Sequence, residues 1–203
     1  MNKKSFFISI EGLEGSGKSS VIKFIEKLLR KKKASFKIYR EPGSTKIGEK
    51  IREILLDNKN KKLSAHTELL LYLAARTQLI EEKLENDLKK YDFIICDRFF
   101  DSTLAYQGFA LGLGKIVESS VKKFSLGLTP DLTLFLDVLP ALGLSRLKTK
   151  DRIESRDSSF HNRLRQGYLG LAKKYPNRIK IIDATDTLPE IYQRIQKQLE
   201  KLL

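Results

Sequence analysis

Short apolar stretches alternate with longer amphipathic stretches along this chain. The short stretches have the length of strands and cover 6–10, 35–40, 91–96, 132–136 and 178–182. Between them, apolar residues recur at spacings of three and four, which predicts helices. The helical stretches cover about 18–31, 45–55, 64–89, 99–107, 115–126, 140–147, 160–175 and 188–203. Strands alternating with helices predict a three-layer α/β fold in which five parallel strands are covered by helices on both faces.

The first apolar stretch leads directly into a glycine-rich motif that fits G-x-x-x-x-G-K-[ST]. The motif consists of Gly12, Leu13, Glu14, Gly15, Ser16, Gly17, Lys18 and Ser19. A strand, this loop and a helix together are the context of a phosphate-binding P-loop. The glycines let backbone N–H groups point at phosphate oxygens beside the positive end of the helix. Lys18 would reach the β- and γ-phosphates and the Ser19 hydroxyl would bind Mg²⁺, so we predict that the chain binds a nucleoside triphosphate.

Charged residues follow the other predicted strands. They are Arg40-Glu41, Asp97-Arg98, Asp137 and Asp183. Ligands of parallel α/β sheets bind at the carboxyl ends of the strands, so these residues are expected to meet beside the P-loop. The fork of arginine suits phosphate, and a second phosphorylated substrate facing the γ-phosphate would need Arg40, Arg76 or Arg98. This inventory suffices for phosphoryl transfer, which depends mainly on positioning and electrostatic stabilisation.

The segment at about 148–159 (KTKDRIESRDSS) is charged and poor in core residues. We therefore predict a mobile lid, whose Arg152 and Arg156 would close over the transferring group. The chain contains no internal repeat and no linker that separates two domains. We expect one P-loop NTPase domain over 1–203, with this lid as its mobile part.

Net charge, hydropathy and cysteine content limit the classes of partner and the location that we expect. The net charge of +14 is compatible with a nucleic-acid partner or with anionic small substrates. The lysine clusters at 31–33 and 59–62 have no interleaved aromatic residues, so we expect no nucleic-acid partner. No apolar run approaches the roughly 20 residues that cross a bilayer, so we expect no membrane association. The lone Cys96 cannot form an internal disulfide, which favours a reducing, cytoplasmic location.

Eight motifs, in a fixed order over nearly the whole chain, resemble those of bacterial thymidylate kinases (dTMP kinases). They are IEGLEGSGKS at 10–19, REPG at 40–43, LAAR at 73–76, DR at 97–98, STLAYQG at 102–108, PDLTLFLDV at 130–138, DRIE at 151–154 and IDAT at 182–185. The resemblance implies transfer of the γ-phosphate of ATP to dTMP in dTTP synthesis, with Mg²⁺. It also implies a homodimer, formed through the predicted helix at 64–89.

The resemblance further implies roles for individual residues of the phosphate and metal sites. Glu14 matches the P-loop acid that approaches the sugar 3′-hydroxyl or the metal region. Arg40 and Arg98 match arginines that grip the dTMP phosphate. Asp97 matches the acid linked to Mg²⁺ and its waters. Gly15 stands where one version of the family has an arginine, so the resemblance places the missing catalytic charge in the lid.

Within the lid, Arg152 is the first candidate for that charge and Arg156 the second. In the base pocket, Arg76 matches the residue that reads the thymine ring. Tyr72 stands where the family commonly stacks a phenylalanine on that ring, and Thr103 is placed to bond the base. Tyr106 matches the tyrosine below the sugar that favours deoxyribose. Two alternatives stay open at this point: a kinase for another nucleoside monophosphate, and a basic P-loop ATPase that binds nucleic acid.

Overall fold

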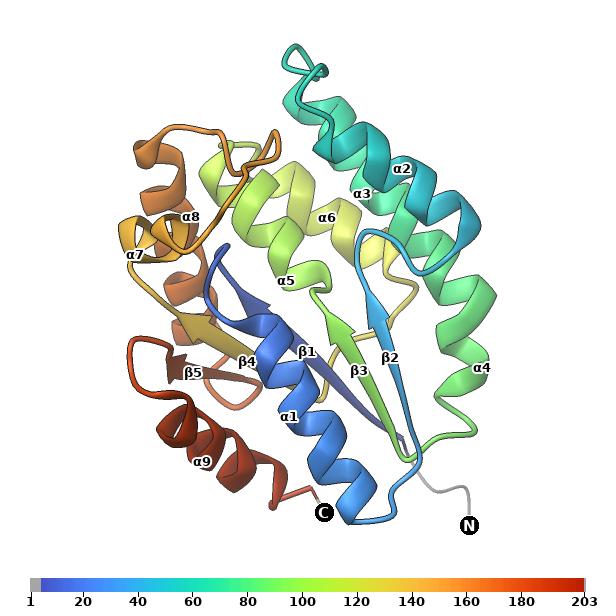
Figure 1. The fold of residues 1–203 in the computed structure, drawn as a ribbon. Coiled ribbons are helices and arrows are strands. Elements are labelled where there is room, and N and C mark those ends of the chain that lie inside the picture. The colour runs from blue at the N-terminus through green and yellow to red at the C-terminus, as the bar shows by residue number, and fades with distance from the viewer. Residues whose placement is uncertain (1–4, 203) are drawn as a thin grey trace.

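Five parallel strands form one sheet in the computed structural model, which describes residues 5–202. The strands are β1 (Phe6–Gly12), β2 (Phe36–Arg40), β3 (Phe93–Asp97), β4 (Leu132–Asp137) and β5 (Ile179–Asp183). Their order is β2-β3-β1-β4-β5, with β1 in the centre (Figure 1). This arrangement confirms the predicted five-stranded parallel α/β sheet.

The register of the strands brings the predicted charged residues to one edge of the sheet. Asp97 of β3 lies opposite both Ile10 of β1 and Arg40 of β2. Asp137 and Asp183 lie opposite each other at the ends of β4 and β5. The loop that follows β1 therefore begins between strands whose final residues are charged.

Helices connect the strands and cover both faces of the sheet. They are α1 (Lys18–Lys31), α2 (Lys46–Leu56), α3 (Ala65–Leu79), α4 (Glu85–Asp87), α5 (Phe100–Thr103), α6 (Lys115–Phe124), α7 (Pro140–Ser145), α8 (Ser158–Lys174) and α9 (Leu188–Leu199), with π-helical segments η1 (Ile80–Leu84) and η2 (Leu104–Ala110). Ile8 of β1 packs in a core that includes α1 and α9. Its neighbour Phe7 packs in a second core with α3 and α6. Successive side chains of a strand point to opposite faces, so the two cores lie on the two sides of the sheet.

The helix boundaries follow from local capping. Ser64 accepts a hydrogen bond from the Thr67 backbone N–H and begins α3. Asp157 likewise accepts from the Phe160 N–H, which starts α8 two residues before the predicted 160. The predicted single helix over 64–89 is instead α3, the π-helical η1 and the short α4 in succession. A second π-helical segment, η2, follows α5, and such segments are frequent at functional sites.

Candidate active site

The glycine motif forms a loop between β1 and α1. Lys18, the first residue of α1, folds its Nζ back on the loop and donates to the Gly12 and Leu13 carbonyl oxygens, both at 3.0 Å. Burial lowers the pKa of Lys18 to about 8, Arg98 adds to this shift, and Glu14 opposes it. A bound polyphosphate would favour the charged form of the same lysine.

Gly15 is required by the packing of α7 against this loop. Its φ of +70° lies in the left-handed region, and a Cβ there would stand 2.0 Å from the Gly143 carbonyl oxygen. Conversely, a Cβ on Gly143 would stand 2.4 Å from the Glu14 carbonyl oxygen. From the same side, Arg146 donates its Nη1 to the Gly15 carbonyl oxygen at 3.0 Å. The close approach of two backbones therefore leaves no room for a side chain at position 15.

Arg98, from the turn after β3, reaches across to the loop. Its Nη2 donates to Glu14 Oε1 at 2.9 Å, and the Tyr106 hydroxyl donates to the same oxygen at 2.5 Å. The guanidinium carbon lies 5.2 Å from the centre of the Tyr106 ring. Burial raises the pKa of Glu14, but Arg98 and Lys18 outweigh burial, so the pKa of Glu14 lies below its ordinary value.

A buried carboxylate beneath Arg98 holds the backbone of that residue. Arg98 has φ +70°, an uncommon conformation for a residue other than glycine. Glu11 accepts from the Phe99 N–H at 2.7 Å, directly after this residue, and from the Ser102 and Tyr168 hydroxyls at 2.5 and 2.9 Å. These bonds fix the turn in which Arg98 lies. Burial raises the pKa of Glu11, with Asp101 adding to the shift.

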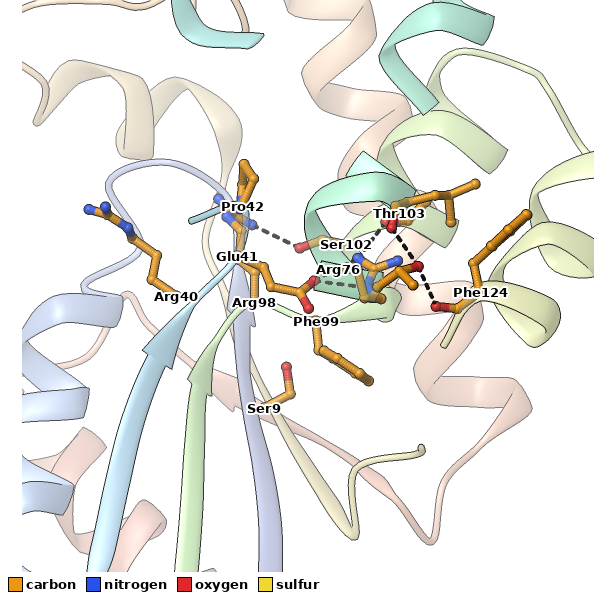
Figure 2. Close-up of polar contacts among 12 residues, drawn as sticks. Ser9, Arg40, Glu41, Pro42, Arg76, Arg98, Phe99, Ser102, Thr103 and Phe124 are labelled. Atoms are coloured by element: carbon orange, nitrogen blue, oxygen red, sulfur yellow. Dashed lines mark hydrogen bonds and ion pairs between the residues drawn. The ribbon is translucent and has the colours of Figure 1, made fainter. Parts of the chain in front are cut away.

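Arg76 is buried and lies between Glu41 and Thr103 (Figure 2). Its Nε donates to Glu41 Oε2 and its Nη2 to Thr103 Oγ1, each at 2.8 Å. Its Nη1 and Glu41 Oε1 are buried and have no partner among the described residues. Burial raises the pKa of Glu41 to about 7, although Arg76 opposes the shift. A polar group of a ligand could therefore bond Arg76 Nη1 or Glu41 Oε1.

One cleft of about 270 Å³ joins these groups. Of the predicted site residues, it is lined by Glu14, Gly15, Lys18, Ser19, Arg40, Tyr72, Asp97, Arg98, Thr103 and Tyr106. Of the other loop positions, Leu13 and Ser16 are buried, as is Arg76. Arg40 is exposed and its Nη2 contacts both oxygens of Glu49, at 3.0 and 2.9 Å. The structure therefore brings the phosphate loop, two of the predicted arginines and both predicted tyrosines to one cleft.

Oxygen ligands for Mg²⁺ are present in this cleft. The Ser19 hydroxyl and the Asp97 carboxylate both line it, and oxygen donors are those that Mg²⁺ prefers. Glu14 adds a buried Oε2 without a partner among the described residues. The donor set fits a cation held partly by phosphate oxygens. Within 5–202 there is no self-contained cluster of three or more His, Cys, Asp or Glu that could hold a metal.

The predicted lid arginines lie elsewhere in this structure. Arg152 is buried, and its Nη2 and the Nη2 of Arg156 both bond Glu68 Oε2 at 2.6 Å. Arg152 Nε also donates to the Leu55 carbonyl oxygen at 2.7 Å. The next residue, Ile153, is buried in the core, so the middle of the segment is anchored. Its mobility stays a prediction.

Several residues of the site were not identified from the sequence. Arg52 lines the cleft and donates to the Pro42 carbonyl oxygen at 3.1 Å. Gln107 lines the cleft and donates to Glu68 at 2.9 Å. Arg146 contacts the phosphate loop, as described above. For Glu68, the partner of Gln107, the available signal was a charge within an otherwise apolar helical pattern, because a buried charge needs a partner.

Comparison with known proteins agrees with this geometry. A family model described as thymidylate kinase matches residues 10–195. A thymidylate kinase of Clostridium novyi (strain NT) is 41% identical over 202 residues, which cover 97% of this chain and 98% of the relative. One from Caldanaerobacter subterraneus subsp. tengcongensis is 42% identical over 203 residues, covering 97% and 96%. The solved thymidylate kinase structure from Ehrlichia chaffeensis superposes with a TM-score of 0.80 at 28% identity, covering 97% of this chain and 99% of that chain.

Proposed function

The chain belongs to the thymidylate kinase family, and from this membership we propose that it transfers the γ-phosphoryl group of ATP to dTMP, giving ADP and dTDP for dTTP synthesis. The observation that supports this most directly is the shared cleft. The phosphate loop with Lys18 lines the same cleft as Arg98, Tyr72 and Tyr106. A donor and an acceptor phosphate can therefore face each other across it.

On the donor side, the N–H groups of the loop and the positive end of α1 cradle the ATP phosphates. Lys18 leaves the carbonyl oxygens of Gly12 and Leu13 and bonds the β- and γ-phosphates instead. Ser19 and Asp97 are the residues that would hold Mg²⁺. Mg²⁺, when bound, neutralises charge that develops on the transferred phosphoryl group.

On the acceptor side, Arg98 and Arg40 grip the dTMP phosphate as bidentate donors. Arg98 exchanges its contact with Glu14 for this phosphate, which frees Glu14 for the sugar 3′-hydroxyl or the metal region. Tyr106 lies against the sugar. Tyr72 stacks on the thymine ring, since an aromatic side chain supplies a flat apolar face.

The base is read from the back of the cleft. Nη1 of Arg76, which has no partner within residues 5–202, and the Thr103 hydroxyl that Arg76 holds can donate to the polar edge of thymine. Because these groups are buried, a base that leaves them unbonded costs their desolvation. This pocket therefore selects the base more strongly than an apolar pocket of equal size would.

A positive charge that a glycine at position 15 cannot supply must come from the lid or from an arginine beside the loop. Arg152 is the candidate that the sequence favours, but it reaches a phosphate only after leaving Glu68 and the Leu55 carbonyl oxygen. Arg146 is the alternative, since its guanidinium already contacts the loop. One properly placed charge of this kind contributes about 100- to 1,000-fold in turnover.

A substrate panel tests the proposed function. ADP release is measured with dTMP, dUMP, dCMP, UMP and AMP at saturating ATP and Mg²⁺. We expect the highest kcat/KM with dTMP, and no turnover above background in the Lys18→Ala variant. Preference for a base other than thymine or uracil would contradict the assignment.

The family membership also supports a homodimer. Leu70 on α3 is 63% exposed and Phe124, the last residue of α6, is 38% exposed. The two helices touch, because the Thr77 hydroxyl donates to the Phe124 carbonyl oxygen at 3.1 Å. We assign the dimer contact to this face. Sedimentation of the Leu70→Asp variant as a monomer, against a dimeric wild type, is the expected result.

The free cysteine of the chain bears on the location of the enzyme. The buried Cys96 is a free thiol, which suits a reducing compartment, and we propose the cytoplasm. Within the described residues, the helices are too short or too polar to cross a bilayer. Fractionation of cells that express the tagged chain, with activity recovered in the cytosolic fraction, is the test.

A further inference from the structure

Glu68 is a buried carboxylate that the phosphoryl-transfer chemistry does not use. It lies in the first turn of α3 and is 0% exposed. A carboxylate near a helix N-terminus is stabilised by the helix dipole. One carboxylate oxygen bonds a residue of the acceptor cleft, and the other bonds two arginines of the lid.

The first oxygen holds a residue of the cleft. Oε1 of Glu68 accepts from Gln107 Nε2 at 2.9 Å. A carboxylate can only accept, so this bond fixes which end of the Gln107 amide faces Glu68. The amide oxygen of Gln107 is thereby left as the polar atom that can face the acceptor cleft. Gln107 follows Tyr106 in η2, within the wall of that cleft.

The second oxygen holds the lid. Oε2 of Glu68 accepts from Nη2 of Arg152 and from Nη2 of Arg156, each at 2.6 Å. Arg152 is additionally tied to the end of α2 through the Leu55 carbonyl oxygen. A carboxylate is well placed there, because removing it would leave one buried and one partly buried guanidinium group uncompensated.

The same lid turn forms part of the cleft wall. Asp151 Oδ1 accepts from the backbone N–H groups of Ile153 and Glu154, at 2.8 and 2.9 Å, which makes 151–154 a tight turn. Asp151, Ile153 and Glu154 line the cleft, while Arg152 points the other way, to Glu68. The Glu68 bond thus sets where this turn lies over the cleft.

We propose that Glu68 is a positioning residue that couples the acceptor pocket to the lid. Its carboxylate orients Gln107 in the wall of the pocket and fixes the 151–154 turn over it. Occupation of the pocket by dTMP and the order of the lid are therefore linked. This inference rests on the proposed function, because its ligand is the acceptor nucleotide.

The Glu68→Gln variant tests the coupling. Glutamine has nearly the same shape but one of its two ends is a donor, so either Gln107 or the arginine pair loses its acceptor. Glu53→Gln is the matched control, because Glu53 is an exposed carboxylate on α2 near the same lid. We expect Glu68→Gln to raise the KM for dTMP by about fivefold or more. The control should stay within about twofold of the wild type, as expected for a surface change.

A second readout follows the lid directly. Trypsin cleavage after Lys148 and Lys150 is measured with and without saturating dTMP. We expect dTMP to protect these sites in the wild type and in Glu53→Gln, and to lose this effect in Glu68→Gln. A purely structural role would lower the Tm of Glu68→Gln but leave the KM for dTMP and the protection unchanged, and that result would overturn the proposal.

A second pair of variants keeps the test available if Glu68→Gln does not fold. Gln107→Met and Arg156→Gln change the two ends of the network separately. Their effects on protection by dTMP should be less than additive in the double variant, since both act through Glu68. Full additivity would overturn the coupling. Absence of dTMP turnover in the wild type would instead refute the proposed function, which keeps the two failures distinct.

Discussion

Replacing Gly15 by alanine tests whether α7 is locked against the phosphate loop. The alanine would keep the left-handed backbone conformation of Gly15. Its Cβ would lie 2.0 Å from the Gly143 carbonyl oxygen, which is far inside van der Waals contact. The backbone conformation costs roughly 1–2 kcal/mol for an L-residue. Forcing the two backbones apart costs about 1–3 kcal/mol more, by analogy with overpacked cores. We therefore expect Gly15→Ala to lower the free energy of unfolding by about 2–5 kcal/mol.

Gly112→Ala is the matched control for this variant. Its φ of +75° carries the same left-handed cost, but nothing lies within 4 Å of the added Cβ. The difference between the two variants isolates the contact with α7. Chemical or thermal unfolding of the ligand-free protein measures it, at roughly 2–4 °C in Tm per kcal/mol for a chain of this size.

The same variant has a functional consequence. The Gly15 carbonyl oxygen is held by Arg146, so a displaced loop also disturbs that guanidinium. We expect Gly15→Ala to raise the KM for ATP as well as to destabilise the fold, whereas Gly112→Ala should do neither beyond its backbone cost. Equal losses of stability in the two variants would refute the argument that packing forces glycine at position 15.

Four further predictions concern charges in or near the cleft. Arg98→Ala removes charge-assisted hydrogen bonds to the acceptor phosphate and should raise the KM for dTMP about 10- to 100-fold, and steady-state kinetics with unaltered dTMP saturation would contradict this placement. Because burial lowers the pKa of Lys18 to about 8, the free enzyme loses this charge above that pH. The kcat/KM for ATP should therefore fall as pH rises through 8, and a profile that is flat to about pH 9.5 would contradict it. If Arg152 carries the catalytic charge, Arg152→Ala should lower turnover more than it weakens dTMP binding. In either case the variant should lower the Tm, since its guanidinium is buried on Glu68. Arg146→Ala should lower kcat about 100- to 1,000-fold with an unchanged Tm if Arg146 carries the catalytic charge. An unchanged kcat in either variant assigns that charge to the other arginine.

The fold was predictable because its inner strands β3 and β4 are largely apolar runs that end in an aspartate. A parallel sheet buried on both faces needs such runs, as in the stretch that became β3. The π-helical turns were not predictable, because η1 preserves the apolar positions of a helix, with Ile80 and Leu84 buried. A π-helix bonds residues five apart and an α-helix residues four apart, and this difference over one turn hardly changes the spacing of apolar residues.

The site was predictable where its residues are close in sequence. The phosphate loop is a local motif, and its predicted side chains Lys18 and Ser19 do line the cleft. The environment of Arg152 was not predictable, because Glu68 lies 84 positions away in the chain. Composition marked 148–159 as a solvated segment. A single carboxylate from α3 instead draws Arg152 into the interior, and only tertiary packing determines that pairing.

Arg98 and Arg152 show why pairing with a carboxylate does not by itself define a role. Both guanidinium groups bond a glutamate, but the side chains of Arg98 and Glu14 are 16% and 12% exposed within the open cleft. Those of Arg152 and Glu68 are 6% and 0% exposed. An anionic ligand can compete with Glu14 for Arg98, because ligand and water reach that pair. Moving Arg152 away would break a buried ion pair and remove one of the two guanidinium partners of Glu68, which is strongly destabilising. Ligand binding should therefore change the partner of Arg98 and leave that of Arg152 in place, which favours Arg146 as the source of the mobile charge.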